Sequence, residues 1–173
     1  MYQLFTKRLS LLLRRLYRIK RSTMMRLHNR VLPSNELLND RWEKAKYLGF
    51  GEGTSIYDSA TVFGKVMVGK DTWIGPFTIL DGSGGLSIGD TCSISTGVQI
   101  YSHDSVKWAV SGGKEKYEYE ATSIGNRCYI GPNVIIAKGC KLGDGCIVGA
   151  NSFVNKSFPA GSKIAGNPAR ILE

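Results

Sequence analysis

Residues 124–154, IGNRCYIGPNVIIAKGCKLGDGCIVGANSFV, decide the fold of this chain. An aliphatic residue returns at every sixth position of this stretch, and Gly or Ala follows each of the first five. The aliphatic positions are Ile124, Ile130, Ile136, Leu142, Val148 and Val154. A period of six is neither the 3.6-residue period of an α-helix nor the simple alternation of one strand. It predicts a parallel β-helix of hexapeptides, whose coils must stack because no single unit buries its own aliphatic residue.

The same period extends toward the N-terminus, with one shift and one interruption. The earlier positions are Ile56, Val62, Val68, Ile74, Leu80, Ile88, Ile94 and Ile100. The shift of two residues falls in the glycine-rich segment 81–85, where we predict a bulge or a small loop. Eighteen extra residues separate Ile100 from Ile124, and they predict an excursion loop over about 102–123. We therefore expect an N-terminal helical region at 1–50 and a β-helix domain at 51–173.

The positive charge of the chain is concentrated in an N-terminal arm. The net charge is +9, and nine of the 23 basic residues lie within residues 1–35, which contain no Asp or Glu. The remainder holds 14 basic and 14 acidic residues, so the β-helix itself is neutral. A general affinity of the β-helix for anions is therefore not expected.

The arm, residues 1 to about 32, has the pattern of an amphipathic helix. Apolar residues recur at steps of four and three, at Phe5, Leu9, Leu12, Leu16 and Ile19. The longest apolar run covers only residues 11–13, too short for a transmembrane span or a signal peptide. Two roles stay open: contact with an anionic cytoplasmic membrane face, or packing on the solenoid or a neighbouring subunit as a cap. Nucleic-acid binding is not expected, since no recognition module is present.

A second short helix is predicted from Pro33 to about Tyr47, with Ser34 or Asn35 as its N-cap. The four cysteines, Cys92, Cys128, Cys140 and Cys146, each follow a repeat aliphatic residue by four positions. Both kinds of position face the same way on a strand, so we interpret these cysteines as small buried thiols rather than metal ligands. Such thiols fit a reducing, cytoplasmic setting.

Three local motifs accompany the repeats: Ile79-Leu80-Asp81, the segment 98–103 that ends at His103, and the ending IAGNPARI at 164–171. With these motifs the chain resembles the hexapeptide-repeat acyltransferases, in their maltose/galactoside acetyltransferase-like branch. The resemblance implies a left-handed β-helix that forms a homotrimer with sites at the subunit interfaces. It further implies acetyl-CoA as co-substrate, no metal, and a hydroxyl or amine as acceptor.

His103 is one of two histidines, and the resemblance identifies it as the general base. A neutral imidazole is suited to take a proton from the acceptor, which then attacks the thioester directly. The family pattern suggests Glu118 as the group that orients the imidazole. Glu120 or a backbone carbonyl stays an alternative, and the simpler interpretation of Glu115, Glu118 and Glu120 is a solvated, charged loop face. The adjacent Asp104 should point away from the imidazole.

The resemblance also assigns residues to the acceptor. Asp81 matches an aspartate that contacts sugar, although its simpler role is a turn-forming residue before Gly. Trp73 stands where the branch has asparagine; an aromatic plate packs on a sugar ring but supplies no amide contacts. This departure argues against a simple galactoside or maltose acceptor. Asp104 and Trp108 belong to the excursion, which we expect to face the acceptor as a flap.

For coenzyme A, the resemblance indicates Tyr129, Gly131, Gly149, Ala150, Lys156 and Arg170. Small residues permit close approach of the pantetheine arm, and the two cations suit phosphates, unless they are merely solvated surface charges. We therefore expect an acetyl-CoA-dependent acetyltransferase acting on a sugar or nucleotide sugar, in surface polysaccharide biosynthesis. Transfer to oxygen or nitrogen stays open. The alternatives are a serine or antibiotic acetyltransferase and a non-catalytic β-helix scaffold. A zinc carbonic anhydrase of this fold is excluded, because it needs three histidines.

Overall fold

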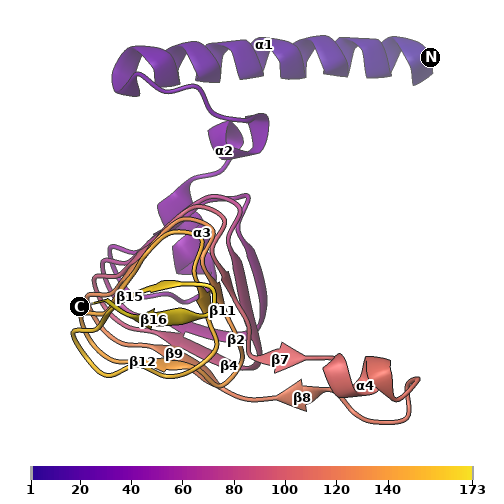
Figure 1. Ribbon diagram of the computed structural model, residues 1–173. Helices are drawn as coiled ribbons and strands as arrows, with labels where there is room; N and C mark the ends of the chain where they lie inside the picture. Colours follow the sequence, from indigo (N-terminus) through magenta and orange to yellow (C-terminus); the bar gives the residue numbers. More distant parts are fainter. Residues whose placement is uncertain (1, 173) are drawn as a thin grey trace. The chain divides into compact units, whose positions relative to one another are not determined.

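The computed structural model describes residues 2–172, and the chain divides into a unit Met1–Asp40 and a unit Arg41–Glu173 (Figure 1). Met1 and Glu173, the outer ends of the two predicted regions, lie outside the described residues. The division falls ten residues before the expected boundary at 50, since the helix that precedes the first coil contacts that coil.

The first unit contains α1 (Tyr2–His28) and α2 (Ser34–Leu38), which contact each other. The arm therefore forms the long helix that its apolar pattern predicted. It ends where Asn29 adopts a left-handed conformation with φ of 51°, a common way to end a helix. The predicted N-cap is wrong: Pro33 occupies that position, and Ser34 and Asn35 lie inside α2. Among residues 2–172, no helix is both long and apolar enough to cross a membrane.

A break at Asn39 and Asp40 separates α2 from α3 (Arg41–Tyr47), so the predicted second helix is two helices. The Nζ atom of Lys44 donates to the backbone carbonyls of Tyr57, Asp58 and Ala60 at 3.0, 2.9 and 2.8 Å. Ala45 is buried in the core that the coils share. In this way α3 caps the first coil, an end that a solenoid cannot leave open.

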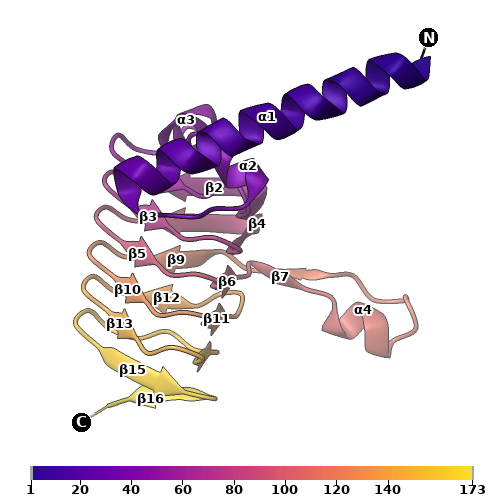
Figure 2. The ribbon, with the colours of Figure 1, turned by 90° about the horizontal axis from the view of Figure 1, so that it is seen from above.

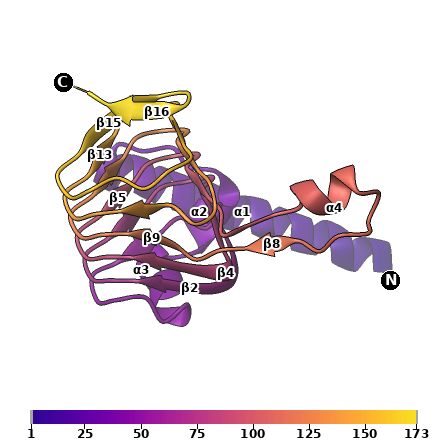
Figure 3. The same ribbon diagram turned by 60° about the horizontal axis from the view of Figure 1, so that its bottom comes forward.

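From Ser55 onward the chain forms a left-handed parallel β-helix with three faces, whose coils stack one on another (Figures 2 and 3). The first face consists of β1 (Ser55–Ile56), β3 (Trp73–Ile74), β5 (Ser93–Ile94), β10 (Tyr129–Ile130), β13 (Ile147–Val148), β15 (Lys163–Gly166) and β16 (Ala169–Ile171). The second and third faces belong to one sheet, because two long strands continue round the turn between them. Its strands are β2 (Thr61–Val68), β4 (Ile79–Ile88), β6 (Gln99–Ile100), β9 (Thr122–Ile124), β11 (Ile135–Ile136), β12 (Lys141–Leu142) and β14 (Phe153–Val154).

The repeat aliphatic residues fill the core as their spacing predicted, and all but the partly buried Val62 are buried. Their register confirms the period: Ile130 pairs with Ile94 and Val148 on the first face. The structure adds one coil that the period missed. Phe158 follows Val154 by four residues, bridges to Leu142 and continues the third face, and Ile164 continues the first.

Every departure from the period of six falls at the turn between the second and third faces, which we call the variable corner. The steps there are eight residues from Leu80 to Ile88, 24 from Ile100 to Ile124 and four from Val154 to Phe158. The predicted bulge is confirmed, because β4 pairs with β2 through a register shift after Gly64. The predicted excursion is also confirmed. It carries β7 (His103–Asp104), α4 (Val106–Val110) and β8 (Glu118–Tyr119) away from the coils (Figure 2).

All four cysteines are buried, as predicted. Three of them lie in one column at the start of the first face, and each Sγ contacts a carbonyl of the following coil. The contacts are Cys92 to Gly125 at 3.1 Å, Cys128 to Gly143 at 3.3 Å and Cys146 to Pro159 at 3.2 Å. Within residues 2–172, no group of three or more His, Cys, Asp or Glu is arranged to hold a metal ion.

Candidate active site

Asp81 and His103 meet at the variable corner, on adjacent coils. The Nδ1 atom of His103 lies 2.5 Å from Oδ2 of Asp81. Asp81 is fully buried, whereas the His103 side chain remains 33% exposed. The imidazole therefore has one nitrogen anchored inside the protein and an edge open to solvent.

The Asp81 carboxylate is surrounded by hydrogen-bond donors. The Ser83 N–H donates to Oδ1 at 3.0 Å, while the N–H and O–H of Ser102 donate to Oδ2 at 2.9 and 3.3 Å. Burial by itself would raise the pKa of Asp81, but these bonds and the one from His103 outweigh it and hold the pKa well below its usual range. Asp81 is therefore a buried carboxylate that stays ionised.

The glycines of the bulge allow this close packing. A Cβ added to Gly84 would lie 2.3 Å from the carbonyl oxygen of Ser102, a distance that real side chains do not tolerate. The Gly84 N–H donates to Oγ of Ser102 at 2.8 Å, which orients that hydroxyl toward Asp81. The shift in the hexapeptide period thus brings β4 into contact with the segment that carries His103.

An ionised Asp81 determines what the imidazole can do. A carboxylate only accepts hydrogen bonds. In a neutral His103 the proton therefore resides on Nδ1, and the N–H donates a hydrogen bond to Asp81. The lone pair then resides on Nε2, the nitrogen available to an acceptor group. The arrangement of a base oriented by a buried acid is the one that general-base chemistry requires.

Glu118 lies elsewhere than predicted, because its carboxylate is bound by two lysines. Oε2 accepts from Nζ of Lys138 at 2.8 Å, and Oε1 is 2.6 Å from Nζ of Lys107. Lys138 also contacts Asp104 at 2.8 Å. Asp104 and Glu118 are cross-strand partners in the β7–β8 hairpin, so one cation bridges two facing carboxylates. Asp81 takes the orienting place that we predicted for Glu118.

The two ion pairs of Lys138 tie the base of the hairpin to the next coil. The bonds from Lys107 and Lys138 lower the pKa of Glu118, and the bond from Lys138 lowers that of Asp104. Sequence reasoning missed Lys138, although the repeat carried a signal. It follows Ile136 by two residues, as Ser102 follows Ile100, and Ile136 pairs with Ile100 on neighbouring coils.

Aromatic side chains of the excursion surround the imidazole. The His103 ring stacks at 5.8 Å on Tyr119 and at 6.4 Å on Tyr117, and Trp108 meets Tyr117 edge to face at 5.5 Å. The excursion thus brings Trp108 within one aromatic contact of His103, through Tyr117. The two tyrosines were not predicted; their alternation with Glu118 and Glu120 was the available signal.

Trp73 lies on the first face, on β3, and not on the sheet that carries Asp81. It packs edge to face against Tyr57 at 6.0 Å. Within one chain the structure therefore does not bring Trp73 together with His103.

Four of the six candidate coenzyme A residues form a continuous strip. Tyr129 lies on the exposed side of β10, and Gly131, Gly149 and Ala150 follow the first-face strands of two neighbouring coils. A Cβ on Gly131 would lie 2.7 Å from the Ala150 nitrogen, so the coils pack closely here. Arg170 pairs with Ala165 beside this strip, whereas Lys156 lies at the variable corner over the Phe158 ring.

Comparisons with known proteins agree with this architecture. Residues 121–156 match the family described as bacterial transferase hexapeptide (six repeats). The chain is 33% identical over 112 residues to the putative colanic acid biosynthesis acetyltransferase WcaF of Escherichia coli K12, covering 62% of this chain. It spans 58% of the length of that relative.

Solved structures show the same fold. A maltose O-acetyltransferase from Clostridium difficile 630 is 26% identical, with a TM-score of 0.58, and the match covers 94% of this chain and 87% of that one. AntD, an N-acyltransferase from Bacillus cereus solved with dTDP and 3-hydroxybutyryl-CoA, is 21% identical with a TM-score of 0.65, covering 78% and 90%. The predicted resemblance to hexapeptide-repeat acetyltransferases is confirmed.

Proposed function

We propose that this chain, which shares its hexapeptide repeats and its fold with bacterial acetyltransferases, transfers an acetyl group from acetyl-CoA to a hydroxyl or amine of a sugar or nucleotide sugar. The observation that carries this proposal is the pair of a buried, ionised Asp81 and a solvent-accessible His103. A non-catalytic β-helix scaffold would not require an imidazole oriented by a buried carboxylate.

In this mechanism, Nε2 of His103 takes the proton from the acceptor as its oxygen or nitrogen attacks the thioester carbonyl carbon. The tetrahedral intermediate collapses with cleavage of the carbon–sulfur bond, and the imidazolium returns its proton to the departing thiolate of coenzyme A. Asp81 stabilises the imidazolium that exists between these two steps.

The strip of Tyr129, Gly131, Gly149 and Ala150 is the proposed place of the pantetheine arm, with Arg170 and Lys156 at the phosphates. Because Lys156 and this strip lie on different sides of one solenoid, we propose a homotrimer in which neighbouring subunits complete each site. Trp73 of one subunit would then face the acceptor beside His103 of another, and Asp104, Glu118 and Trp108 would hold the flap over it.

Two relatives support a sugar acceptor. WcaF is named for colanic acid biosynthesis, and AntD was solved with dTDP, the nucleotide portion of a nucleotide sugar. We extend this to a role in surface polysaccharide biosynthesis, at the cytoplasmic side of the membrane. The aromatic Trp73 and Trp108 favour a sugar ring over the small amino acid that a serine acetyltransferase accepts.

The test is release of free coenzyme A from acetyl-CoA with a panel of nucleotide sugars, amino-sugar nucleotides and simple glycosides. We expect turnover on one class, abolished in His103→Ala and strongly reduced in Asp81→Asn. Turnover with serine and with no sugar would show that the proposed sugar acceptor is wrong and would favour a serine acetyltransferase. Failure to bind acetyl-CoA would overturn the proposed activity.

A further inference from the structure

The long helix α1 presents an apolar stripe to its surroundings. The stripe consists of Phe5, Leu9, Leu12, Leu16 and Ile19, whose side chains are between 41% and 65% exposed. These positions lie on one face because an α-helix turns by about 100° per residue. A stripe of large exposed side chains along a 27-residue helix needs an apolar partner.

The opposite side of α1 is basic. By the same rotation, Lys7, Arg14 and Arg18 lie across the helix from the stripe, and Arg8 and Arg15 lie along one edge of it. No acidic residue occurs before Glu36, so this charge is not compensated within the helix. Whatever covers the stripe must therefore also tolerate or attract a dense row of cations.

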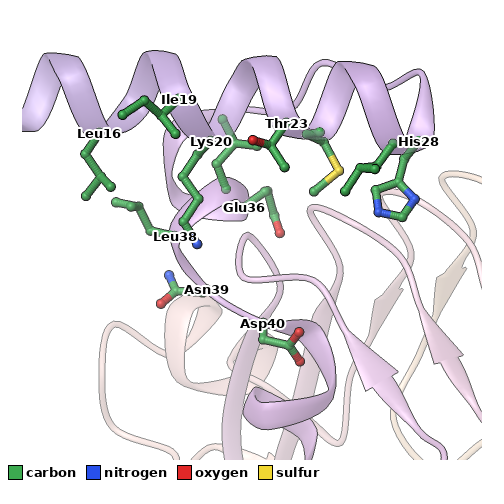
Figure 4. Close-up of a pocket in the computed structure, with 12 residues that line it drawn as sticks. Leu16, Ile19, Lys20, Thr23, His28, Glu36, Leu38, Asn39 and Asp40 are labelled. Carbon is green, nitrogen blue, oxygen red and sulfur yellow. The ribbon is translucent and has the colours of Figure 1, made fainter.

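The stripe continues into a groove between α1 and α2, with a volume of about 440 Å³ (Figure 4). Leu16 and Ile19 belong to both the stripe and the groove, and Leu27, Leu37 and Leu38 add to its apolar lining. The lining also contains charged side chains of both signs, namely Lys20, Glu36 and Asp40. The groove thus extends the apolar surface of the stripe, while the excess of positive charge belongs to the other side and the edge of α1.

The charge decides between possible occupants. A bundle of several α1 helices would cover the stripes but would bring together eight Lys and Arg side chains from each copy, and α1 itself contains no carboxylate to compensate them. Nucleic acid would neutralise the cations and leave the stripe in water. An anionic lipid surface satisfies both, since its acyl boundary accepts the stripe and its headgroups accept the cations.

We propose that the unit formed by α1 and α2 binds an anionic lipid surface, with the apolar stripe of α1 at the acyl boundary and the cations along the edge of the stripe at the headgroups. The long stems of Lys and Arg allow cations at the edge of the stripe to reach the headgroups while the helix lies in the surface plane. This inference goes beyond acetyl transfer and rests on residues of the first unit alone.

The experiment is co-sedimentation of the full chain with phosphatidylcholine vesicles and with vesicles containing phosphatidylglycerol. We expect binding to the anionic vesicles only, weakened at high salt because surface charges are screened. Arg8→Gln with Arg15→Gln, which removes the two cations at the edge of the stripe, should lower partition about tenfold, given the attraction of each cation to such surfaces. Leu12→Ser with Leu16→Ser should lower it at least as much. The matched control is Lys114→Gln with Lys116→Gln, which removes two exposed cations from the excursion and should leave binding unchanged.

Equal binding to neutral and anionic vesicles, or no binding by the wild type, would overturn the proposal. So would a leucine variant that binds vesicles normally but has a changed mass in light scattering, because the stripe would then pack between copies. Vesicle binding is measured without substrate, so its failure is separate from failure of the transferase proposal. Release of coenzyme A by each variant shows that the β-helix unit is intact.

Discussion

At the residue scale, the imidazole of His103 is held at Nδ1 by the carboxylate of Asp81, which is buried away from water. Asp81 gains bonds from Ser83 and Ser102 in addition to His103, so its charge is stabilised before any substrate arrives. A base held in this way loses little freedom when it accepts a proton. Two predictions test the pair, one through turnover and one through stability.

Replacement of His103 by Ala should lower kcat by roughly 10²- to 10⁴-fold, the range that a positioned general base contributes. Acetyl-CoA binding should change little, because the imidazole acts on the acceptor. Stopped assays of coenzyme A release and a binding titration measure the two quantities. Tyr47→Ala, which alters a highly exposed side chain on α3, is the control. Near-wild-type turnover in the His103 variant would show that His103 is not the general base.

Replacement of Asp81 by Asn should destabilise the protein more at neutral than at acid pH. The folded protein lowers the pKa of Asp81, so its stabilising contribution is fully present above its ordinary pKa of about 3.9 and is lost as the pH falls through the folded value. The difference in unfolding free energy between wild type and variant should therefore shrink below about pH 4. Urea unfolding at pH 7 and pH 3 measures it; a difference independent of pH would contradict the assignment.

At the scale of elements, the β7–β8 hairpin carries His103 while projecting away from the coils that support it. Asp104 and Glu118 oppose each other across the two strands, and facing like charges would push the strands apart. Lys138, from the following coil, lies 2.8 Å from both carboxylates. It is a positioning residue for His103, because His103 and Asp104 form the same two-residue strand.

Lys138→Met should lower kcat by about tenfold, since it leaves two carboxylates facing each other beside His103. Lys138→Arg should retain most activity, and adding Asp104→Asn and Glu118→Gln to Lys138→Met should restore part of it by removing the repulsion. Lys46→Met, an exposed lysine of α3, is the control. A rise in acceptor KM with unchanged kcat would instead indicate direct substrate contact by Lys138.

The elements that repeat were predictable from the sequence, and those that interrupt the repeat were predictable only as interruptions. The period located the core, but it missed Phe158 because the step from Val154 shortens to four residues. A single helix was expected where α2 and α3 occur, because the pattern does not show that α2 contacts α1 while Lys44 anchors α3 to the first coil.

The same limit applies to the site. His103 was selected from its motif, but the direction of Asp81 depends on a bulge and on amides 21 residues further along the chain, which strand alternation does not describe. Glu118 was suggested by the family pattern, but its carboxylate is bound by Lys107 and Lys138. Contacts between coils require the three-dimensional register, and only a residue in a regular column, such as Lys138, could have been placed by counting.

At the scale of the whole molecule, stability is spread along stacked coils rather than concentrated in one centre. Each coil contributes one aliphatic residue to each face, so neighbouring coils protect one another. The four cysteines lie in three of these coils, and the side chain of each is buried in the shared interior. They can therefore report whether the coils open separately or together.

We expect all four thiols to resist a disulfide reagent such as DTNB in the folded protein and to react at the rate of unfolding in urea. The reason is that all four side chains are buried; burial of Cys140 also raises the pKa of this thiol, which leaves less of its reactive thiolate. Mass spectrometry of the partly modified chain would show four modified thiols or none. Early modification of Cys140 or Cys146 alone would show that the C-terminal coils open first.

The variable corner is a place where segments of other lengths can be inserted into this β-helix. At the other two corners of the solenoid, every step between successive core positions is six residues. The variable corner alone accommodates steps of four, eight and 24 residues. Segments of different length can therefore be exchanged there without shifting the register of the coils above and below. If the proposed activity holds, recombination at that point would change the acceptor and leave the proposed coenzyme A strip unchanged, in nature or in a library.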